Sequence, residues 1–241
     1  MRRVAIVAGT IVVLLAAAAG LRALAKSTTY QLFGDVVSRV ETSDSVVALT
    51  FDDGPNAAVM DSLLRVLGRR DVRATFFVVG QTLAESPDLA IQLRNLGHEI
   101  ANHSYTHRRM APMRPSTIAA EIERTDSLLL LGGQSGELFF RPPYGYKLLG
   151  LPWYLARRGR PTIMWDIEPD SYPEVAATAD GIVRHVLERV RPGSIILLHP
   201  WYASRRTSLE AVGPLIDSLH ASGYRVTTVS RLLRGRTTAR P

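Results

Sequence analysis

The sequence contains no cysteine among its 241 residues. Thiol catalysis and cysteine-ligated zinc are therefore excluded, and the chain can fold in an oxidising compartment without disulfide bonds. A membrane anchor built on a lipidated cysteine is excluded as well. Internal repeats and low-complexity runs are also lacking, and the length is sufficient for one domain with a full core.

Acidic residues are missing from both ends of the chain. Residues 1–26 and residues 231–241 each carry four basic side chains and no Asp or Glu. Because the whole chain has a formal net charge of +7, residues 27–230 are nearly neutral. This distribution argues against a nucleic-acid-binding surface and favours basic ends that lie close to a membrane.

The N-terminal segment has an 18-residue run without charge, Val4–Leu21, which follows two arginines. Such a run is typical of an export segment. Its length exceeds the apolar core of about 7–15 residues in a signal peptide, which favours an uncleaved membrane anchor over residues 1–26. The alternative is secretion after cleavage behind Ala25, where small residues fit a cleavage site. Either alternative places the remainder of the chain outside the cytoplasm.

The remaining chain alternates between strand-like and helix-like segments. Residues 27–44 are expected to form a linker or an N-terminal edge, residues 45–235 a catalytic domain, and residues 236–241 a basic tail. Apolar runs predict strands at 46–51, 74–79, 98–102, 138–140, 162–165, 194–199 and 225–229. Helical patterns lie at 57–69, 87–97, 116–131, 148–158, 178–190 and 208–222. This alternation predicts an α/β fold with a mostly parallel sheet.

Two aspartates and two histidines form a candidate metal site. Asp52 and Asp53 follow the first apolar strand, and His103 and His107 are four residues apart. Two imidazoles and one carboxylate, with a position left open, are the ligands of catalytic zinc. The second aspartate is then a candidate general base. Each motif alone has a simpler explanation, because Asp-Gly-Pro is a common turn and a lone histidine pair usually lies on the surface.

Three further motifs lie at or near predicted strand ends. Arg141-Pro-Pro-Tyr-Gly145 is either a stiff connector or a site loop in which Tyr144 offers the first backbone N–H after the prolines. His199 ends the buried run that begins at Ile195, and a core histidine is the simpler interpretation. The third stretch, Trp165–Tyr172, contains two aspartates and two aromatic residues.

Together these motifs resemble the polysaccharide deacetylases of carbohydrate esterase family four, over roughly residues 45–230. The resemblance implies a distorted seven-stranded (β/α) barrel, with the site on loops at the carboxyl ends of the strands. It also implies metal-dependent removal of N-acetyl groups from an envelope or extracellular polysaccharide, such as peptidoglycan or a chitin-like polymer. The expected cofactor is a divalent ion, zinc by preference, with cobalt or another ion as alternatives.

The resemblance assigns roles residue by residue. The metal ligands are expected to be Asp53, His103 and His107. Catalysis is expected from Asp52 as base, His199 as acid, Arg141 as the partner of Asp52, and the Tyr144 N–H as a donor to the oxyanion. Substrate contacts are expected from Leu197, Tyr172 and Trp165. The family's aspartate beside the catalytic histidine is displaced here, so Asp166 and Asp170 compete for that role.

Other functions fit parts of the pattern. The chain could hydrolyse a different substrate, such as acetylated xylan or a small amide, or bind glycans without catalysis. An intact base and acid argue against a simple binder, and an export segment argues against small cytoplasmic amides. We expect a monomer that binds no nucleic acid. His98 is expected to be structural or on the surface, and His185 and His220 are expected to face solvent.

Overall fold

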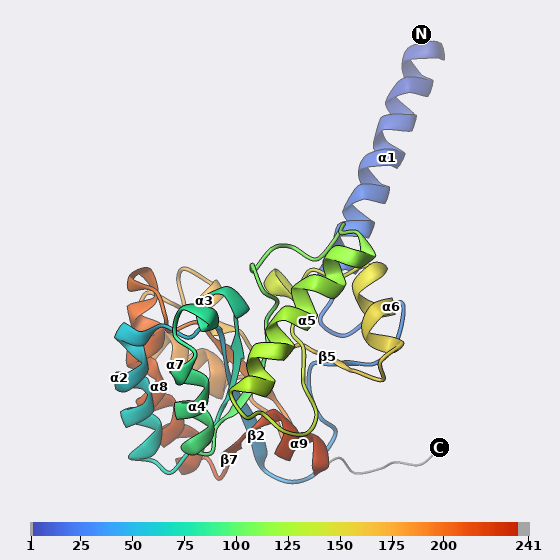
Figure 1. The fold of residues 1–241 in the computed structure, drawn as a ribbon. Coiled ribbons are helices and arrows are strands. Elements are labelled where there is room, and N and C mark those ends of the chain that lie inside the picture. Colours follow the sequence, from blue (N-terminus) through green and yellow to red (C-terminus); the bar gives the residue numbers. More distant parts are fainter. Residues whose placement is uncertain (1, 236–241) are drawn as a thin grey trace.

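The computed structural model describes residues 2–235, with side chains from residue 10 onward. The predicted basic tail at 236–241 lies outside the described residues. The chain begins with helix α1 (Arg2–Lys26), which extends away from an α/β body (Figure 1). The carboxyl end of α1 meets the body, where the side chain of Ala25 is only 5% exposed.

A parallel sheet forms the centre of the body, as the sequence predicts. Its middle strand is β2 (Val46–Gly54), which lies between β3 (Thr75–Val78) and β6 (Ile195–Leu198). Strand β4 (Glu99–Asn102) pairs with β3, and β7 (Arg225–Thr227) pairs with the beginning of β2. All these pairings are parallel, so the carboxyl ends of the strands share one edge.

Single-residue bridges extend this sheet toward a barrel. Phe140 bridges Asn102 on one side and Thr162 on the other, and Ile167 bridges Ile196 of β6. Thr162 belongs to β5 (Thr162–Ile163), which pairs with β1 (Val36–Val37). At Phe140 and Ile167, the neighbouring strands are therefore joined by isolated bridges instead of continuous ladders of hydrogen bonds. The strand predicted at 138–140 is reduced to the single bridge residue Phe140, and the two prolines after Arg141, which donate no N–H, prevent its continuation.

The six helices predicted in the body are present with small shifts at their ends. Their bounds are α2 (Ala57–Gly68), α4 (Asp88–Asn95), α5 (Pro115–Leu131), α6 (Gly150–Ala156), α7 (Ala179–Leu187) and α8 (Arg206–Ala221). Two short helices were not predicted, α3 (Gly80–Glu85) and α9 (Val229–Arg234). The strand predicted at 225–229 stops early because the Thr228 side chain caps α9 by accepting from Arg231 N.

Strand β2 is buried on both faces. Val47, Leu49 and Phe51 belong to one core cluster, and Val46 and Ala48 belong to the other. A strand covered on both faces requires apolar residues at successive positions, as parallel sheets usually do. This burial fixes the carboxyl end of β2 firmly in the middle of the molecule.

Residues 27–44 form an N-terminal edge of the domain instead of a free linker. Strand β1 pairs with β5, and Val37 and Val40 are almost completely buried. The apolar side chains of this otherwise polar segment supply the reason, because they pack into the core cluster beside β5 and β6. The folded body thus begins before the boundary at residue 45 that the sequence suggested.

The membrane anchor predicted over Val4–Leu21 is not confirmed. Within the part of the chain that the structure describes, no helix is both long enough and apolar enough to cross a membrane. The side chains at positions 4–9 of the predicted segment are outside the described residues.

The end of β2 is packed too tightly to accept a side chain at Gly54. A Cβ atom built there would lie 2.4 Å from Cε2 of Trp201. We therefore expect Gly54→Ala to reduce the free energy of unfolding by about 1–3 kcal/mol, the usual cost of overpacking. Thermal unfolding measures this, with Gly68→Ala as control: open space surrounds Gly68, and alanine there should add about 0.5–1 kcal/mol. A Gly54→Ala protein that melts like the unmodified one would contradict the packing.

Candidate active site

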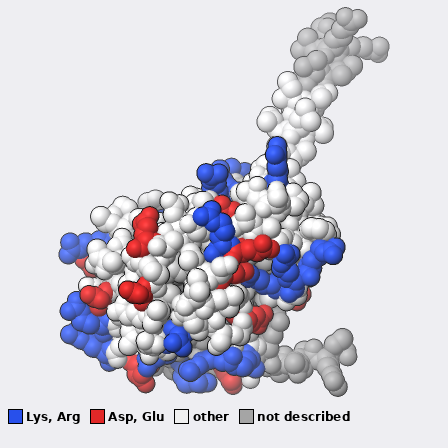
Figure 2. All heavy atoms as spheres, in the orientation of Figure 1, with Lys and Arg blue, Asp and Glu red and all other residues white. Residues whose placement is uncertain are grey.

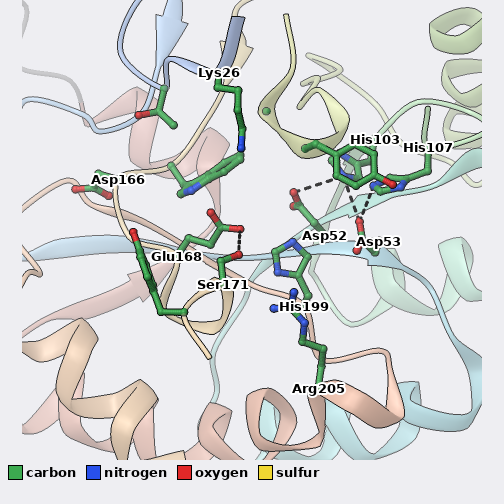
Figure 3. Close-up of a pocket in the computed structure, with 15 residues that line it drawn as sticks. Lys26, Asp52, Asp53, His103, His107, Asp166, Glu168, Ser171, His199 and Arg205 are labelled. Atoms are coloured by element: carbon green, nitrogen blue, oxygen red, sulfur yellow. Dashed lines mark hydrogen bonds and ion pairs between the residues drawn. The ribbon is translucent and has the colours of Figure 1, made fainter. Parts of the chain in front are cut away.

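The two aspartates lie together at the carboxyl end of β2 but in different surroundings. The pairing of β2 with β3 shifts register between Asp52 and Gly54, and Asp53 adopts a positive φ of 73°. This irregularity interrupts the alternation of the strand, so that both carboxylates approach the same cleft (Figure 3). Asp52 is 2% exposed, whereas Asp53 is partly exposed.

Asp52 is held by Arg141, which is completely buried. Nη1 of Arg141 donates to Oδ1 of Asp52 at 2.6 Å and to Oγ1 of Thr50 at 2.9 Å. Its Nη2 donates to the Met164 carbonyl at 3.0 Å, and its guanidinium lies 3.9 Å from the Phe77 ring centroid. Burial lowers the pKa of Arg141, and the charge of Asp52 opposes that effect. One oxygen of Asp52 is therefore fixed, while Oδ2 faces the histidines.

His103 is oriented by the backbone of Arg141. Its Nδ1 lies 2.8 Å from the Arg141 carbonyl oxygen, which makes Nδ1 the protonated nitrogen. Nε2 is then directed at the aspartates, 3.4 Å from Oδ1 of Asp53 and 3.6 Å from Oδ2 of Asp52. The residue that holds the candidate base thus also sets the tautomer of a candidate metal ligand.

The loop from His103 to His107 is held by polar side chains that the sequence did not indicate. Oε2 of Glu121, on α5, accepts from the backbone N–H groups of Tyr105 and Thr106 at 3.0 and 2.8 Å. Oγ of Ser104 accepts from the His107 backbone N–H at 3.0 Å, and both residues have positive φ. These contacts maintain a strained loop conformation that returns the His107 ring toward His103.

Asp53, His103 and His107 have the geometry of a metal site. Nε2 of His107 lies 2.9 Å from Oδ1 of Asp53, and one donor atom from each residue lies within 4.8 Å of the others. Two neutral imidazoles and a carboxylate suit zinc or a similar divalent ion and leave a position for another ligand. The residues present therefore fit the predicted cofactor.

The electrostatics around Asp53 favour its ionised form. Burial alone would raise the pKa of Asp53, but hydrogen bonds with His103 and His107, together with the charges of His103 and His199, hold it far below the usual range. Tyr202 donates its hydroxyl to Oδ2 of Asp53 at 3.3 Å, and burial with the nearby carboxylate raises the pKa of Tyr202 to about 12. Tyr202 was not predicted as a site residue, although it follows His199 closely in a Trp-Tyr pair.

His199 pairs with Asp170, one of the two aspartates that the sequence left in competition. Nδ1 of His199 lies 3.1 Å from Oδ1 of Asp170, and the His199 backbone N–H donates to Oδ2 at 2.7 Å. Ser208 also donates to Asp170 at 2.9 Å. Burial would lower the pKa of His199, but Asp170 and the more distant charges of Asp52 and Asp53 raise it to about 9.

Asp166 has a different position. Its carboxylate accepts from Oγ of Ser194 and from the Ile195 backbone N–H, both at 2.8 Å. These contacts tie the 165–172 stretch to the beginning of β6. The Asp166 side chain therefore supports the wall of the site instead of contacting His199.

Asp52, Asp53, His103, His107 and His199 line one cleft of about 510 Å³. Tyr144, Trp165 and Tyr172 line it too, and the Tyr144 ring centroid lies 4.8 Å from that of His107. Leu197 is not among its lining side chains, because it is buried within β6 at 1% exposure. Lys26 and Glu168 line the cleft although the sequence analysis assigned them no role (Figure 3).

The three remaining histidines contact no part of the metal site. His98 is buried, accepts from the Ala74 N–H at 3.2 Å, and has a pKa lowered to about 4 by burial and by Arg73. His98 therefore has the structural role, and not the surface position that the sequence also allowed. His185 is half-buried against Tyr172, with ring centroids 5.4 Å apart, so it does not simply face solvent. His220 is exposed as expected.

Similar proteins share both the sequence and the architecture of this chain. Residues 39–157 match the family described as polysaccharide deacetylase. The peptidoglycan-N-acetylglucosamine deacetylase of Bacillus cereus is 30% identical over 207 residues, 83% of this chain and 94% of that protein. The chitooligosaccharide deacetylase of a Bradyrhizobium strain is 31% identical over 198 residues, 77% of this chain and 90% of that protein.

A solved structure supports the same relationship. The crystal structure of the Bc1960 peptidoglycan N-acetylglucosamine deacetylase, bound to 4-naphthalen-1-yl-N-oxidanyl-benzamide, superimposes with a TM-score of 0.77 and 28% identity. The match covers 84% of this chain and 94% of that one. Identity of 30% or more over nearly the whole length of curated relatives shows that the chain belongs to the polysaccharide deacetylase family.

Proposed function

We propose that this protein is a metal-dependent hydrolase that removes N-acetyl groups from a polysaccharide containing N-acetylglucosamine. The reaction converts the N-acetyl group and water into a free amine and acetate. The observation that carries the proposal is the position of Asp52. Its Oδ1 is fixed by Arg141, while its Oδ2 faces the cleft beside the three candidate metal ligands. A site that only bound a metal or a glycan would not need this second, separately held carboxylate.

Asp53, His103 and His107 would hold the cation. When bound, a divalent ion supplies a Lewis acid that polarises a carbonyl oxygen and makes a water molecule more acidic. Asp52 accepts the proton of the attacking water, and Arg141 keeps its carboxylate ionised and oriented. Tyr144 lines the cleft beside His107, and its backbone N–H is the proposed donor to the developing oxyanion.

His199 is the proposed general acid. Because its Nδ1 is directed at Asp170, Nε2 is the nitrogen available to the cleft. The negative charge of Asp170 keeps the imidazole protonated, so Nε2 donates a proton to the leaving nitrogen as the amide bond breaks. Trp165 and Tyr172 offer aromatic surface for the sugar from the same wall.

The separate roles of the two aspartates give a direct test. Asp52→Asn should retain metal and lose acetate release by about 10²–10⁴-fold, the usual contribution of a general base. Asp53→Asn and His103→Ala should instead lose metal, because each removes a ligand. Elemental analysis and acetate release from N-acetylated glycans measure the two effects, and chelation of the unmodified enzyme should stop the reaction. If Asp52→Asn lost metal while Asp53→Asn retained it, the two roles would be exchanged.

The His199–Asp170 pair makes a prediction about pH. A protonated His199 is the active form, so activity should fall as pH rises through about 9. Asp170→Asn removes the main group that raises this pKa and should move the alkaline limb of the kcat profile toward the ordinary value of 6.5. Asp166→Asn is the control and should leave the limb in place. An identical limb in the Asp170→Asn enzyme would exclude the proposed pairing.

The same pair should also affect stability. A raised pKa in the folded state means that the stabilisation is complete below pH 6.5 and is lost as pH rises through about 9. At 1.36 kcal/mol per pKa unit, the change is on the order of 3 kcal/mol. Denaturant unfolding of the metal-free protein across this range should show the decline, and Asp170→Asn should flatten it.

We also infer that the enzyme acts outside the cytoplasm. The uncharged run Val4–Leu21 supports export, and an envelope substrate requires it. Retention on the membrane predicts an intact mass beginning near Met1 in the membrane fraction, whereas cleavage predicts an N-terminus at Lys26 in a soluble external fraction. Fractionation with mass spectrometry distinguishes these forms, and a protein found only in the cytoplasm would refute both.

A further inference from the structure

Two cations and two tyrosines gather at the rim of the cleft, and we name Lys26, Arg109, Tyr144 and Tyr146 the rim cluster. Nζ of Lys26 lies 5.7 Å from the Tyr146 ring centroid, and the Arg109 guanidinium lies 5.1 Å from the same centroid. Arg109 is also 5.5 Å from the Tyr144 ring centroid. Lys26 and Tyr144 both line the cleft, and Figure 3 shows Lys26 across from Arg205. Lys26 and Tyr144 therefore border the proposed site directly, whereas Arg109 and Tyr146 adjoin them without lining the cleft.

The position of Lys26 is set by the body of the protein. The Lys147 backbone N–H donates to the Ala25 carbonyl at 2.9 Å, and the Lys147 ammonium donates to the Ser27 carbonyl. Lys147 itself is 1% exposed. These bonds attach both neighbours of Lys26 to the loop that follows Arg141. Lys and Arg side chains are accordingly exposed where α1 meets the body (Figure 2).

The two cations of the rim cluster have no carboxylate partner in the part of the chain that the structure describes. Among the residues that the structure describes, neither Lys26 nor Arg109 forms an ion pair, and both are exposed. By contrast, Arg205 on the opposite wall is 3.3 Å from Asp170. The carboxylates on the floor are occupied too, Asp52 by Arg141 and Asp53 by the two histidines. Glu168 also lines the cleft, and its carboxylate accepts from Oγ of Ser171 at 2.6 Å. In the described part of the chain, the positive charge of the rim is therefore not used in an ion pair.

We propose that the rim cluster binds a carboxylate carried by the glycan substrate, while the tyrosine rings pack against its sugar. The enzyme then prefers an acidic N-acetylated glycan to a neutral one of the same length. This inference rests on the proposed function, because it concerns the sugar next to the N-acetyl group that is cleaved. The aromatic rings offer an apolar surface to one face of the sugar, and the two cations offer positive charge to its carboxylate.

The expected effects are moderate because both cations are exposed. An exposed ion pair contributes roughly two- to fivefold in affinity, and salt screens it. Lys26→Gln and Arg109→Gln should therefore each raise KM for an acidic glycan about two- to fivefold. The double variant should raise it further, and kcat should change little, because neither side chain contacts the reacting atoms.

The experiment compares two glycans that differ only in charge. One is an oligosaccharide of alternating N-acetylglucosamine and N-acetylmuramic acid with free carboxylates, and the other is the same oligosaccharide with those groups converted to carboxamides. Acetate release gives KM and kcat, and calorimetric binding to the Asp52→Asn protein gives Kd without turnover. The unmodified enzyme should prefer the acidic glycan at low salt and lose that preference as salt increases.

Arg157→Gln is the matched control, because Arg157 is an exposed arginine 5.2 Å from the Trp153 ring centroid, and Trp153, unlike the Tyr144 beside Arg109, does not line the cleft. It removes the same charge and should leave the preference unchanged, and Lys26→Arg should retain it. Equal KM and Kd for both glycans, or equal losses on both in the Lys26 and Arg109 variants, would overturn the proposal. Acetate release from neither glycan would instead refute the deacetylase function, while the binding comparison would still test the rim cluster.

Discussion

The contact between Arg141 and Asp52 organises the site. A guanidinium without solvent exposure is costly to bury, and it is tolerated here because Asp52, Thr50 and backbone carbonyls accept its hydrogens and the Phe77 ring covers it. The same residue uses its own carbonyl to fix the imidazole of His103. The proposed base and one proposed metal ligand therefore share a single support, and the position of one cannot change without the other.

The rest of the site depends on backbone that is held in an unfavourable conformation. Five non-glycine residues in the described part of the chain have positive φ, and four of them, Asp53, Ser104, His107 and Tyr144, are in or next to the site. Such conformations cost on the order of 1–3 kcal/mol each and persist only where surrounding contacts enforce them. The buried strand β2 and the bonds from Glu121 supply this enforcement. Because the scaffold is rigid, the candidate metal ligands Asp53, His103 and His107 can converge from two segments that lie far apart in the sequence.

The sequence was most informative where a residue's type and its spacing both matter. The aspartate pair, the histidine pair and the apolar strands are visible because their chemistry and periodicity leave few alternatives, and the parallel sheet follows from their alternation. The partner of His199 could not be chosen from sequence, because Asp166 and Asp170 differ only in where a short irregular turn directs them. Glu121 and Tyr202 were missed because they act from a helix and a loop far along the chain. Leu197 was placed in the cleft by resemblance, yet it is buried within β6, as are the other three residues of that strand.

Charge in the cleft is organised by depth. At the floor, each carboxylate has a fixed partner, so the negative charges there serve the metal ligands and the base instead of repelling a substrate. In the middle, Asp170 holds His199 in its protonated form. At the rim, Lys26 and Arg109 remain without partners among the described residues. In the proposed recognition of acidic glycans, long-range attraction comes from the charges that are left unpaired, which lie at the rim and not at the floor. Lys26, the last residue of α1, thereby connects the N-terminal helix to the proposed recognition surface.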